Sequence, residues 1–328
     1  MNAQAPSPRV SVVIPTHNNG EYLESALDSV YRQTYAADEI IVVDDASTDD
    51  TAERMQRHTD RVHYVQQSHA GSAVARNRGI MAATGDYIAF LDSDDMWLPE
   101  KLEKQIAIAV EHPDSVLIYC DFHRSETLQT DLTSGLSGRK HWQAGSELES
   151  LLRQNFLHTS SVVVPRHALA SSGLFDPKLI NAQDWDLWLR LAGSGDCRYV
   201  DEVLSFYRLH PTQSVRTTKY ARNLILADEI VLARWGNDPR AERPIKEKLR
   251  EDLWMLGRRE WKAGNFSRAR RAYWRCAEIP GRRVASIARA LACSFPDGLL
   301  RIFQRSRVPA QGTETLQADG QSHAGRRS

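Results

Sequence analysis

The chain has 328 residues, of which 41% are hydrophobic and 26% charged, and its formal net charge is zero. These values exclude a mostly disordered, collagen-like or disulfide-scaffold protein, and no window approaches the roughly 18 uninterrupted apolar residues of a membrane span. The first eight residues have neither a basic start nor an apolar stretch, so we expect no export signal and a cytoplasmic location.

The front half alternates between strand-like and helix-like patterns. Apolar, β-branched runs predict strands at 10–14, 40–43, 62–65, 87–91, 116–120 and 161–164. Helical spacing of apolar residues predicts helices at 22–31, 48–58, 73–83, 101–111 and 184–192. Alternation of this kind with continuous apolar strands predicts an α/β fold, with a Rossmann-like, mostly parallel sheet flanked by helices.

Strand signals end at Arg216, and charge changes sign at the same place. Residues 1–215 hold 18 basic and 30 acidic side chains, whereas residues 216–308 hold 22 basic and 10 acidic ones. Two surfaces that dock on each other would explain this, and so would a metal-binding front half with a basic back half that meets an anionic membrane. Apolar spacing predicts two amphipathic helices joined at Gly264-Asn265 in this back half.

We therefore expect four segments along the chain. These are a disordered start at 1–8, a sheet domain at 9–215, a basic α-helical appendage at 216–308 and a disordered tail at 309–328. Within the appendage, arginines interleave with short apolar stripes over 281–307. This part is a candidate for contact with an anionic membrane surface, and a helical cap on the sheet domain is the alternative. No nucleic-acid-binding module is recognisable.

An acidic cluster follows the strand predicted at 87–91. Asp92, Asp94 and Asp95 lie within four residues, and oxygen ligands at this spacing suit Mg²⁺ or Mn²⁺. The alternative is an acidic turn that caps the helix after Pro99, which is the commoner role of an isolated cluster. Ligands bind at the carboxyl ends of the strands in parallel sheets, where this cluster lies.

A second acidic pair, Asp44 and Asp45, follows the neighbouring strand and should lie at the same edge of the sheet. There a carboxylate can accept a hydrogen bond from a nucleobase or a ribose hydroxyl, and a helix cap is the alternative. No GxGxxG follows the first strand and no GxxxxGK[ST] occurs. A dinucleotide-binding Rossmann site and a P-loop are therefore disfavoured.

Taken together, four motifs resemble those of the family 2 glycosyltransferases, which have the GT-A fold. They are SVVIPTHN at 11–18, IVVDDASTD at 41–49, ARNRG at 75–79 and LDSDD at 91–95, in the family's order and at strand ends. The segments QDWDLWLR at 183–190 and YRLH at 207–210 extend the resemblance, which covers about residues 9–215.

This resemblance implies a site for a nucleotide-sugar donor. Thr16 and Asp45 would hold the base, Arg76 would lie beside the base and diphosphate, and Asp92 would reach the ribose or the metal's water shell. Asp94, with Asp92 and His210, would bind Mn²⁺ or Mg²⁺. The remaining residues expected in the nucleotide-sugar site flank these motifs: Pro15, Asn18, Asp44 and Ser93.

The resemblance also implies that Asp184 is the general base of an inverting transfer. Gln183 replaces the family's usual Glu, which puts in doubt a second carboxylate at the acceptor but leaves the base. Candidates for the acceptor pocket are Thr159, Ser160, Gln183 and Trp185. For the hydroxyls the alternative is ordinary turn polarity, and for the tryptophan it is core packing.

The sequence thus predicts a metal-dependent glycosyltransferase. We expect a UDP-sugar donor and a glycan or lipid-linked acceptor in cell-surface polysaccharide or glycolipid synthesis, on the inner face of the membrane. A catalytically silent nucleotide-sugar-binding or scaffolding protein is one alternative, and Gln183 is its only support. A sugar-nucleotide pyrophosphorylase is the other, but it should carry a Gly-rich, Lys-containing loop where this chain has PTHNNG at 15–20.

Overall fold

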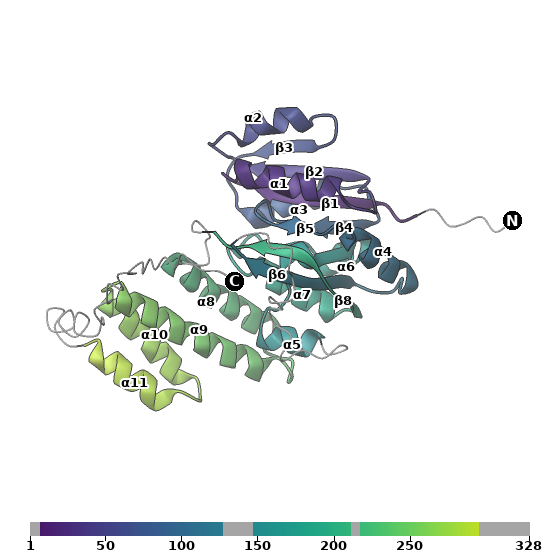
Figure 1. The fold of residues 1–328 in the computed structure, drawn as a ribbon. Coiled ribbons are helices and arrows are strands. Elements are labelled where there is room, and N and C mark those ends of the chain that lie inside the picture. Colours follow the sequence, from purple (N-terminus) through teal and green to yellow (C-terminus); the bar gives the residue numbers. More distant parts are fainter. Residues whose placement is uncertain (1–6, 127–146, 211–216, 295–328) are drawn as a thin grey trace, which may run out of the picture.

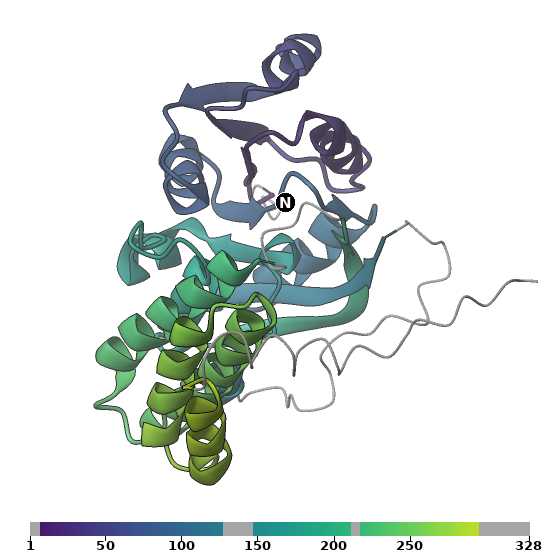
Figure 2. The same cartoon turned by 90° about the vertical axis from the view of Figure 1, so that its left-hand side faces the viewer.

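The computed structural model describes residues 7–126, 147–210 and 217–294. Within these ranges the chain forms an eight-stranded sheet covered by helices, with a stack of further helices below it in the views of Figures 1 and 2. The strand order across the sheet is β3-β2-β1-β4-β7-β6-β8-β5. The expected disordered tail and most of the expected disordered start lie outside the described residues.

One half of the sheet is parallel, as predicted. Its strands are β1 (Val10–Thr16), β2 (Glu39–Asp45), β3 (His63–Gln67) and β4 (Tyr87–Phe90). β1 is buried along its whole length and β2 along all but its first residue, as expected for β-branched runs covered on both faces. The register pairs Thr16 with Asp44, so the polar residues that follow β1 and β2 emerge at one edge.

The other half of the sheet is mixed. Its strands are β5 (Met96–Trp97), β6 (Leu117–Ser125), β7 (Val162–Pro165) and β8 (Cys197–Arg208). β7 is antiparallel to both of its neighbours, β4 and β6, whereas β8 is parallel to β6. The apolar pattern did not predict β8, because Arg198, Asp201 and Glu202 interrupt its apolar residues. This strand matters for function, because it ends beside the acidic residues that follow β4.

Helices cover both faces of the sheet. They are α1 (Gly20–Tyr31), α2 (Thr51–Met55), α3 (Ser72–Ala82), α4 (Lys101–Glu111), α5 (Glu147–Arg153), α6 (Arg166–Ser172) and α7 (Gln183–Ala192), with 3-10 turns η1 (Gln56–His58) and η4 (Thr159–Ser161). Alternate residues of β1 join different cores: Val12 clusters with Leu23 of α1, and Val13 clusters with Trp188 of α7. The sheet is therefore buried on both faces.

A glycine lets α3 approach β1 closely. A Cβ atom on Gly79 would lie only 2.4 Å from Cγ1 of Val13, so no larger residue fits without movement. Arg76 lies on the same helix, and its side chain is buried at the carboxyl edge of the sheet. The close approach thus helps to place a guanidinium group beside the strand ends.

The helical stack continues the core of the sheet domain. It consists of α8 (Thr218–Trp235), α9 (Glu242–Lys262), α10 (Phe266–Glu278) and α11 (Arg283–Ala292), and the predicted joint at Gly264-Asn265 falls between α9 and α10. Val231 and Ile245 belong to the same core cluster as Trp188 of α7. None of the helices in the described ranges combines the length and apolar character needed to cross a bilayer.

A lysine is buried at the start of α4. Nζ of Lys101 donates to Oε1 of Gln105 (2.6 Å) and lies 4.1 Å from the centre of the Trp97 ring. Burial lowers the pKa of this amine from 10.5 to about 8. Because Gln105 also donates to the carbonyl oxygens of Ile118 and Ser161, the buried polar group joins α4 to β6 and η4.

We expect Lys101→Met to remove a pH-dependent contribution to the free energy of unfolding. Between about pH 8 and 10.5 the unfolded chain holds this proton more firmly than the folded one, so the stability of the native protein rises with pH across that window. The substitution should remove this rise, measured by urea unfolding at pH 7 and pH 10. Lys104→Met, on the same helix but partly exposed, is the matched control and should keep it. A Lys101→Met variant that keeps the native rise in stability between pH 7 and pH 10 would contradict the account.

Candidate active site

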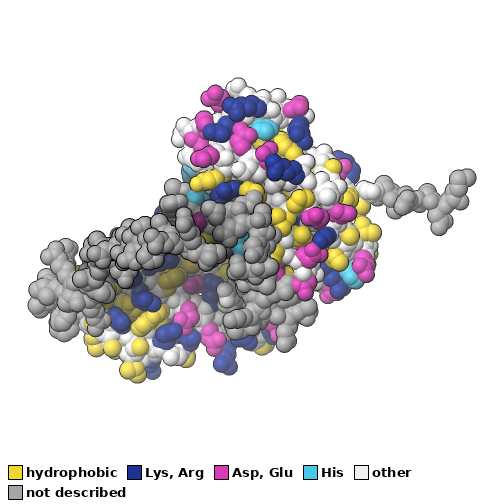
Figure 3. Space-filling view, in the orientation of Figure 1, with side chains coloured by type: hydrophobic (Ala, Val, Ile, Leu, Met, Phe, Trp, Pro, Cys, Tyr) yellow, Lys and Arg dark blue, Asp and Glu magenta, His cyan; other side chains and the backbone are white. Residues whose placement is uncertain are grey.

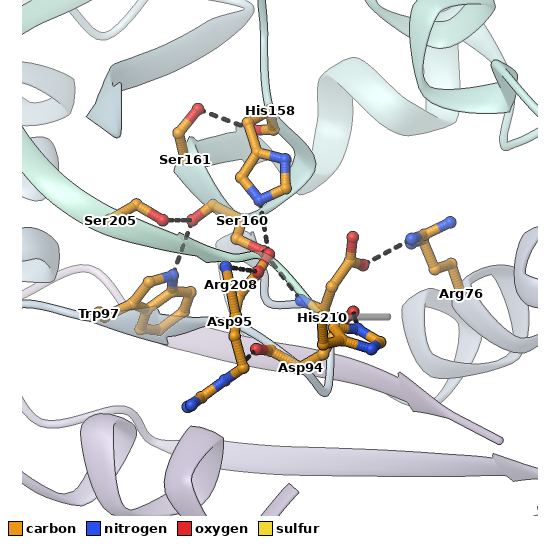
Figure 4. A network of polar contacts seen from close by, with 11 residues as sticks. Arg76, Asp94, Asp95, Trp97, His158, Ser160, Ser161, Ser205, Arg208 and His210 are labelled. Atoms are coloured by element: carbon orange, nitrogen blue, oxygen red, sulfur yellow. Dashed lines mark hydrogen bonds and ion pairs between the residues drawn. The ribbon is translucent and has the colours of Figure 1, made fainter. Parts of the chain in front are cut away.

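The acidic turn after β4 (residues 92–95) lies at the centre of a polar network (Figure 4). Nε2 of His210 lies 2.9 Å from Oδ2 of Asp94. Arg208, at the end of β8, donates from Nε to the carbonyl oxygen of Asp94 (3.0 Å) and from its backbone N–H to Oδ1 of Asp95 (3.1 Å). The structure thus brings Asp94 and His210 together, as the sequence analysis expected, and β8 delivers the histidine.

Asp95 is completely buried and bonds the acidic turn to the segment before β7. Its Oδ2 accepts hydrogen bonds from Nε2 of His158 (2.5 Å) and Oγ of Ser160 (2.5 Å). Burial alone would lower the pKa of His158, but the Asp95 carboxylate outweighs it and raises that pKa above its usual value. This pairing favours the protonated imidazole, and Asp95 links the turn to the segment before β7.

Asp94 is the carboxylate of the turn that is best placed to receive a cation. Burial first, and then the charges of Asp95 and Asp92, raise its pKa to about 6. A divalent cation would offset this repulsion, and carboxylate oxygens with one imidazole suit Mn²⁺ or Mg²⁺. Asp94 and His210 therefore offer two adjacent ligands of the kind that the expected metal takes, whereas Asp92 is bonded to Arg76 and does not form a metal-sized group with them.

Among the described residues, two groups of three side chains each bring possible ligand atoms to within 4.8 Å of one another, and neither group includes Asp94 or His210. Asp95 and His158 form one of these groups with Asp92, but they are bonded to each other inside the fold. His17, Asp45 and His69 form the second, at the ends of β1, β2 and β3, where the two imidazole rings lie 4.7 Å apart. Both of these histidines are exposed, next to the carboxylate expected to hold a base.

The two carboxylates that end β2 are both engaged by protein donors. Oδ2 of Asp44 accepts from the hydroxyl of Tyr64 (2.5 Å). Asp45 accepts from the backbone N–H groups of Ala70 (2.7 Å) and Gly71 (2.8 Å), which shapes the loop before α3. Burial would raise the pKa of Asp45, but these bonds and one from Gln67 lower it below its usual value. These bonds thus favour the ionised form of Asp45 at the sheet edge.

The other residues expected to bind the nucleotide lie around this pair. Pro15 is buried within β1. Thr16 is also buried, and its Oγ1 has no hydrogen-bond partner in the part of the chain that the structure describes. Asn18 has a left-handed φ of 53° and accepts from the backbone N–H of Thr48 (2.7 Å), which ties the loops after β1 and β2 together. Oγ of Ser93 accepts from the amide of Asn19, at the start of α1 (3.1 Å).

Arg76 links the acidic turn to α7. Its Nη2 donates to Oδ1 of Asp92 at 2.5 Å. The Gln183 amide satisfies all its neighbours when its oxygen accepts from Nη1 of Arg76 (2.7 Å) and from the Ser72 hydroxyl (2.6 Å), while its nitrogen donates to the carbonyl oxygen of Leu179 (2.7 Å). Gln183 therefore fastens α3 to the first turn of α7.

Asp184 follows in that first turn of α7. Burial raises the pKa of its carboxyl above the usual value, although the positive charge of Arg76 opposes the shift. The amide of Asn155 donates to its Oδ2 at 2.9 Å. A carboxylate with a raised proton affinity that is held in one orientation is suited to act as a general base.

The four acceptor candidates differ from what the sequence analysis expected. Trp185 is fully buried and its indole N–H donates to the carbonyl oxygen of Leu151 (2.6 Å), so its ring offers no face to a sugar. Thr159, Ser160 and Gln183 are also buried. Ser160 is occupied by the acidic turn, since Oγ also accepts from the backbone N–H of Asp92 (3.0 Å). The Ser160 hydroxyl and the Gln183 amide bond other residues of the site.

Several residues of the site have no signal in the motifs. The Tyr22 ring of α1 lies 4.9 Å from the His210 ring, and the Arg208 guanidinium carbon lies 5.2 Å from the centre of the Tyr22 ring. His158 and Asn155 contact the key carboxylates from the segment between α5 and β7. From the sequence, only the hydroxyl groups of that segment were expected to contribute to the site. An asparagine and a histidine three residues apart form no pattern that predicts contacts with distant carboxylates.

Proteins of similar sequence are glycosyltransferases. Residues 11–166 match the family model described as glycosyl transferase family 2. The chain is 30% identical over 214 residues to an uncharacterised glycosyltransferase of Rickettsia prowazekii, which covers 64% of this chain and 67% of that relative. It is 33% identical over 208 residues to the putative teichuronic acid biosynthesis glycosyltransferase TuaG of Bacillus subtilis, with 62% of this chain and 79% of TuaG covered.

Solved structures share the fold across the chain. S. aureus TarS 1–349 in complex with UDP-GlcNAc aligns with a TM-score of 0.58 and 18% identity, and covers 91% of this chain and 92% of that one. The mannosyltransferase PcManGT from Pyrobaculum calidifontis, in complex with GDP-Man and Mn²⁺, aligns with a TM-score of 0.56 and 21% identity, and covers 92% and 85%. The predicted fold, a GT-A-type sheet with C-terminal helices, is confirmed.

Proposed function

We propose that this chain, which belongs to glycosyl transferase family 2, is an inverting, divalent-metal-dependent enzyme that moves a sugar from a nucleoside-diphosphate donor to a hydroxyl acceptor. One observation carries the proposal. The buried Arg76 bonds Asp92 of the acidic turn, and its charge also acts on Asp184. The guanidinium group of Arg76 thus connects the acidic turn, which is suited to hold the metal and diphosphate, with Asp184, which is suited to take a proton.

In the proposed reaction Asp184 takes the proton of the acceptor hydroxyl as its oxygen attacks the anomeric carbon. A glycosidic C–O bond forms while the bond from that carbon to the phosphate oxygen breaks. The electron pair of the broken bond leaves on the nucleoside diphosphate. Attack from the face opposite the leaving group inverts the anomeric centre. Burial supports the role of Asp184, because it raises the carboxylate's affinity for the proton that it must accept.

The leaving diphosphate gains negative charge, and cationic groups line its proposed position. Arg76 is one of them, and Arg208 is another, held by the carbonyl oxygen of Asp94. A divalent cation held by Asp94, Asp92 and His210 would act as a Lewis acid for the same oxygens. The raised pKa of Asp94 supports this assignment, because burial first and then the charges of Asp95 and Asp92 disfavour its ionised form, and a cation would offset both effects.

We assign the base of the donor to the edge formed by β1 and β2, with a UDP-sugar as the expected donor. The buried Oγ1 of Thr16 has no hydrogen-bond partner among the described residues, so it is available to the base. The ionised form of Asp45 is favoured at the same edge of the sheet. TarS was solved with UDP-GlcNAc and PcManGT with GDP-Man, which supports a nucleotide-sugar donor. The name of TuaG refers to teichuronic acid biosynthesis, and we propose a similar role here, in building a cell-surface polysaccharide or glycolipid.

A glycan or lipid-linked acceptor would require work at a membrane, and α11 has a suitable surface. Its apolar residues Val284 and Leu291 are 83% and 54% exposed, and Arg283 and Arg289 are exposed beside them. Hydrophobic and basic side chains lie together on the helical stack at the lower left of Figure 3. We propose that this face rests on the anionic inner leaflet of the cell membrane. Residues 295–307 of the expected segment lie outside the described residues.

We expect Asp184→Asn to lower kcat by about a hundredfold or more, because an amide cannot take the acceptor proton. Donor binding, measured by calorimetry with Mn²⁺, should be unchanged. Asp94→Asn is the matched contrast, since it should weaken Mn²⁺-dependent donor binding by roughly tenfold or more. Full turnover by Asp184→Asn would refute its role as the base, and donor binding by Asp94→Asn with native affinity would refute the metal assignment.

We expect the pair Val284→Asp and Leu291→Asp to reduce binding to vesicles that contain phosphatidylglycerol. The substitutions place charge in the apolar stripe, and turnover on a soluble acceptor should stay at the native level. Vesicle flotation measures the first effect. Val110→Asp is a suitable control, because Val110 is a similarly exposed apolar residue (59%) on α4. Unchanged vesicle binding by the α11 variant would exclude this face as the membrane contact.

A further inference from the structure

We propose that Asn155 is a positioning residue for Asp184, which fixes the orientation of the carboxylate that receives the acceptor proton. The inference rests on the proposed function, because it requires Asp184 to be the base. It adds a residue outside every motif of the sequence. Nδ2 of Asn155 donates to Oδ2 of Asp184 at 2.9 Å, and the reverse amide orientation would set two oxygens against each other.

The backbone around Asn155 is fixed relative to α7. Asn155 follows α5 by two residues, and the carbonyl oxygen of Leu151 in α5 accepts from the indole of Trp185 at 2.6 Å. Because Trp185 is adjacent to Asp184, one anchor holds the helix that carries the base against the segment that carries its partner. The buried Trp185 thus does not stack on a sugar. Its hydrogen bond to Leu151 fixes the position of the Asn155 amide relative to the Asp184 carboxylate.

The charged and titratable side chains around Asp184 come from three other parts of the chain. Arg76 from α3 favours the ionised carboxylate, and Asp92 from the acidic turn disfavours it. Tyr220 from α8 faces the same charge, and burial together with Asp184 raises its pKa to about 12. Two hydrogen bonds also lower the pKa of Asp184 against the effect of burial: one from the backbone N–H of Trp185, and a second from the neutral side chain of Asn155.

Asn155 also carries a cost that a purely structural residue would avoid. Its buried Oδ1 has no hydrogen-bond partner within the described part of the chain. Buried polar atoms without a partner lower the stability of a fold. An aliphatic side chain of the same size would pack at this position without that cost. A residue that is costly for stability and bonded to the proposed base is typical of a functional site.

The first test uses Asn155→Leu, which keeps the volume and removes the amide. We expect kcat to fall roughly tenfold, because a hydrogen bond to an ionised group is among the stronger kinds. Donor affinity should stay near the native value, and the free energy of unfolding should be equal to or higher than the native one, because the unpartnered Oδ1 is removed. The acidic limb of the kcat/KM profile should move to higher pH, because loss of the bond raises the pKa of the base. Gln154→Leu changes the exposed neighbouring residue and should keep the native profile. Native kcat with an unmoved acidic limb in Asn155→Leu would overturn the proposal.

The second test needs no sugar transfer. The difference in unfolding free energy between the native protein and Asp184→Asn reports the protonation of Asp184. Because the folded chain binds this proton more tightly than the unfolded one, the native protein should lose stability relative to Asp184→Asn as pH rises toward the folded pKa. In the Asn155→Leu background this loss should continue to higher pH. Identical pH dependence in both backgrounds would overturn this inference alone, whereas a native protein without turnover on any acceptor would overturn the proposed function as well.

Discussion

Three carboxylates within four residues repel one another, and much of the site is arranged to offset that repulsion. Each carboxylate of the acidic turn has a partner from a distant part of the chain: Arg76 for Asp92, His210 for Asp94 and His158 for Asp95. These partners come from α3, from the end of β8 and from the segment before β7, so contacts distant in sequence stabilise the turn. Asp94 keeps a raised pKa even so. Burial and the neighbouring carboxylates together disfavour its ionised form, and a divalent cation would offset both effects.

The helix that carries the proposed base is constrained in a different way. Asp186 of α7 is fully buried and bonds Arg190 and Arg234, the second of which comes from α8. Lys248 of α9 lies 4.6 Å from the centre of the Trp185 ring. These contacts of α8 and α9 with α7 help to fix the position of Asp184, although the described helices of the stack add no residue to the acidic turn. Its outer helix, α11, is far from these contacts in Figure 1 and presents an apolar and basic face instead.

The parts of this site that follow local rules could be read from the sequence. Continuous apolar runs predicted the parallel strands, and polar residues directly after those runs had to meet at the carboxyl edge, as Thr16 and Asp44 do. Burial and pairing between distant residues could not be read in this way. His158 looks like a residue of a polar loop until β7 packs beside β4, and Trp185 looks available to a ligand until α5 and α9 cover it. The charged residues of β8 hid a strand whose pairing with β6 delivers His210 to Asp94.

The central claim is that the acidic turn and Asp184 together form a metal-dependent site for sugar transfer. The most direct measurement is the release of nucleoside diphosphate from a panel of nucleotide sugars, each tested with Mn²⁺, Mg²⁺ or EDTA and paired with calorimetric binding of the same donors. The account predicts release from one donor that requires the cation, slow when water replaces the acceptor, and binding of that donor that EDTA abolishes. If no donor is cleaved and none binds in a metal-dependent manner, the account is contradicted, and a protein that only scaffolds other components becomes the better interpretation.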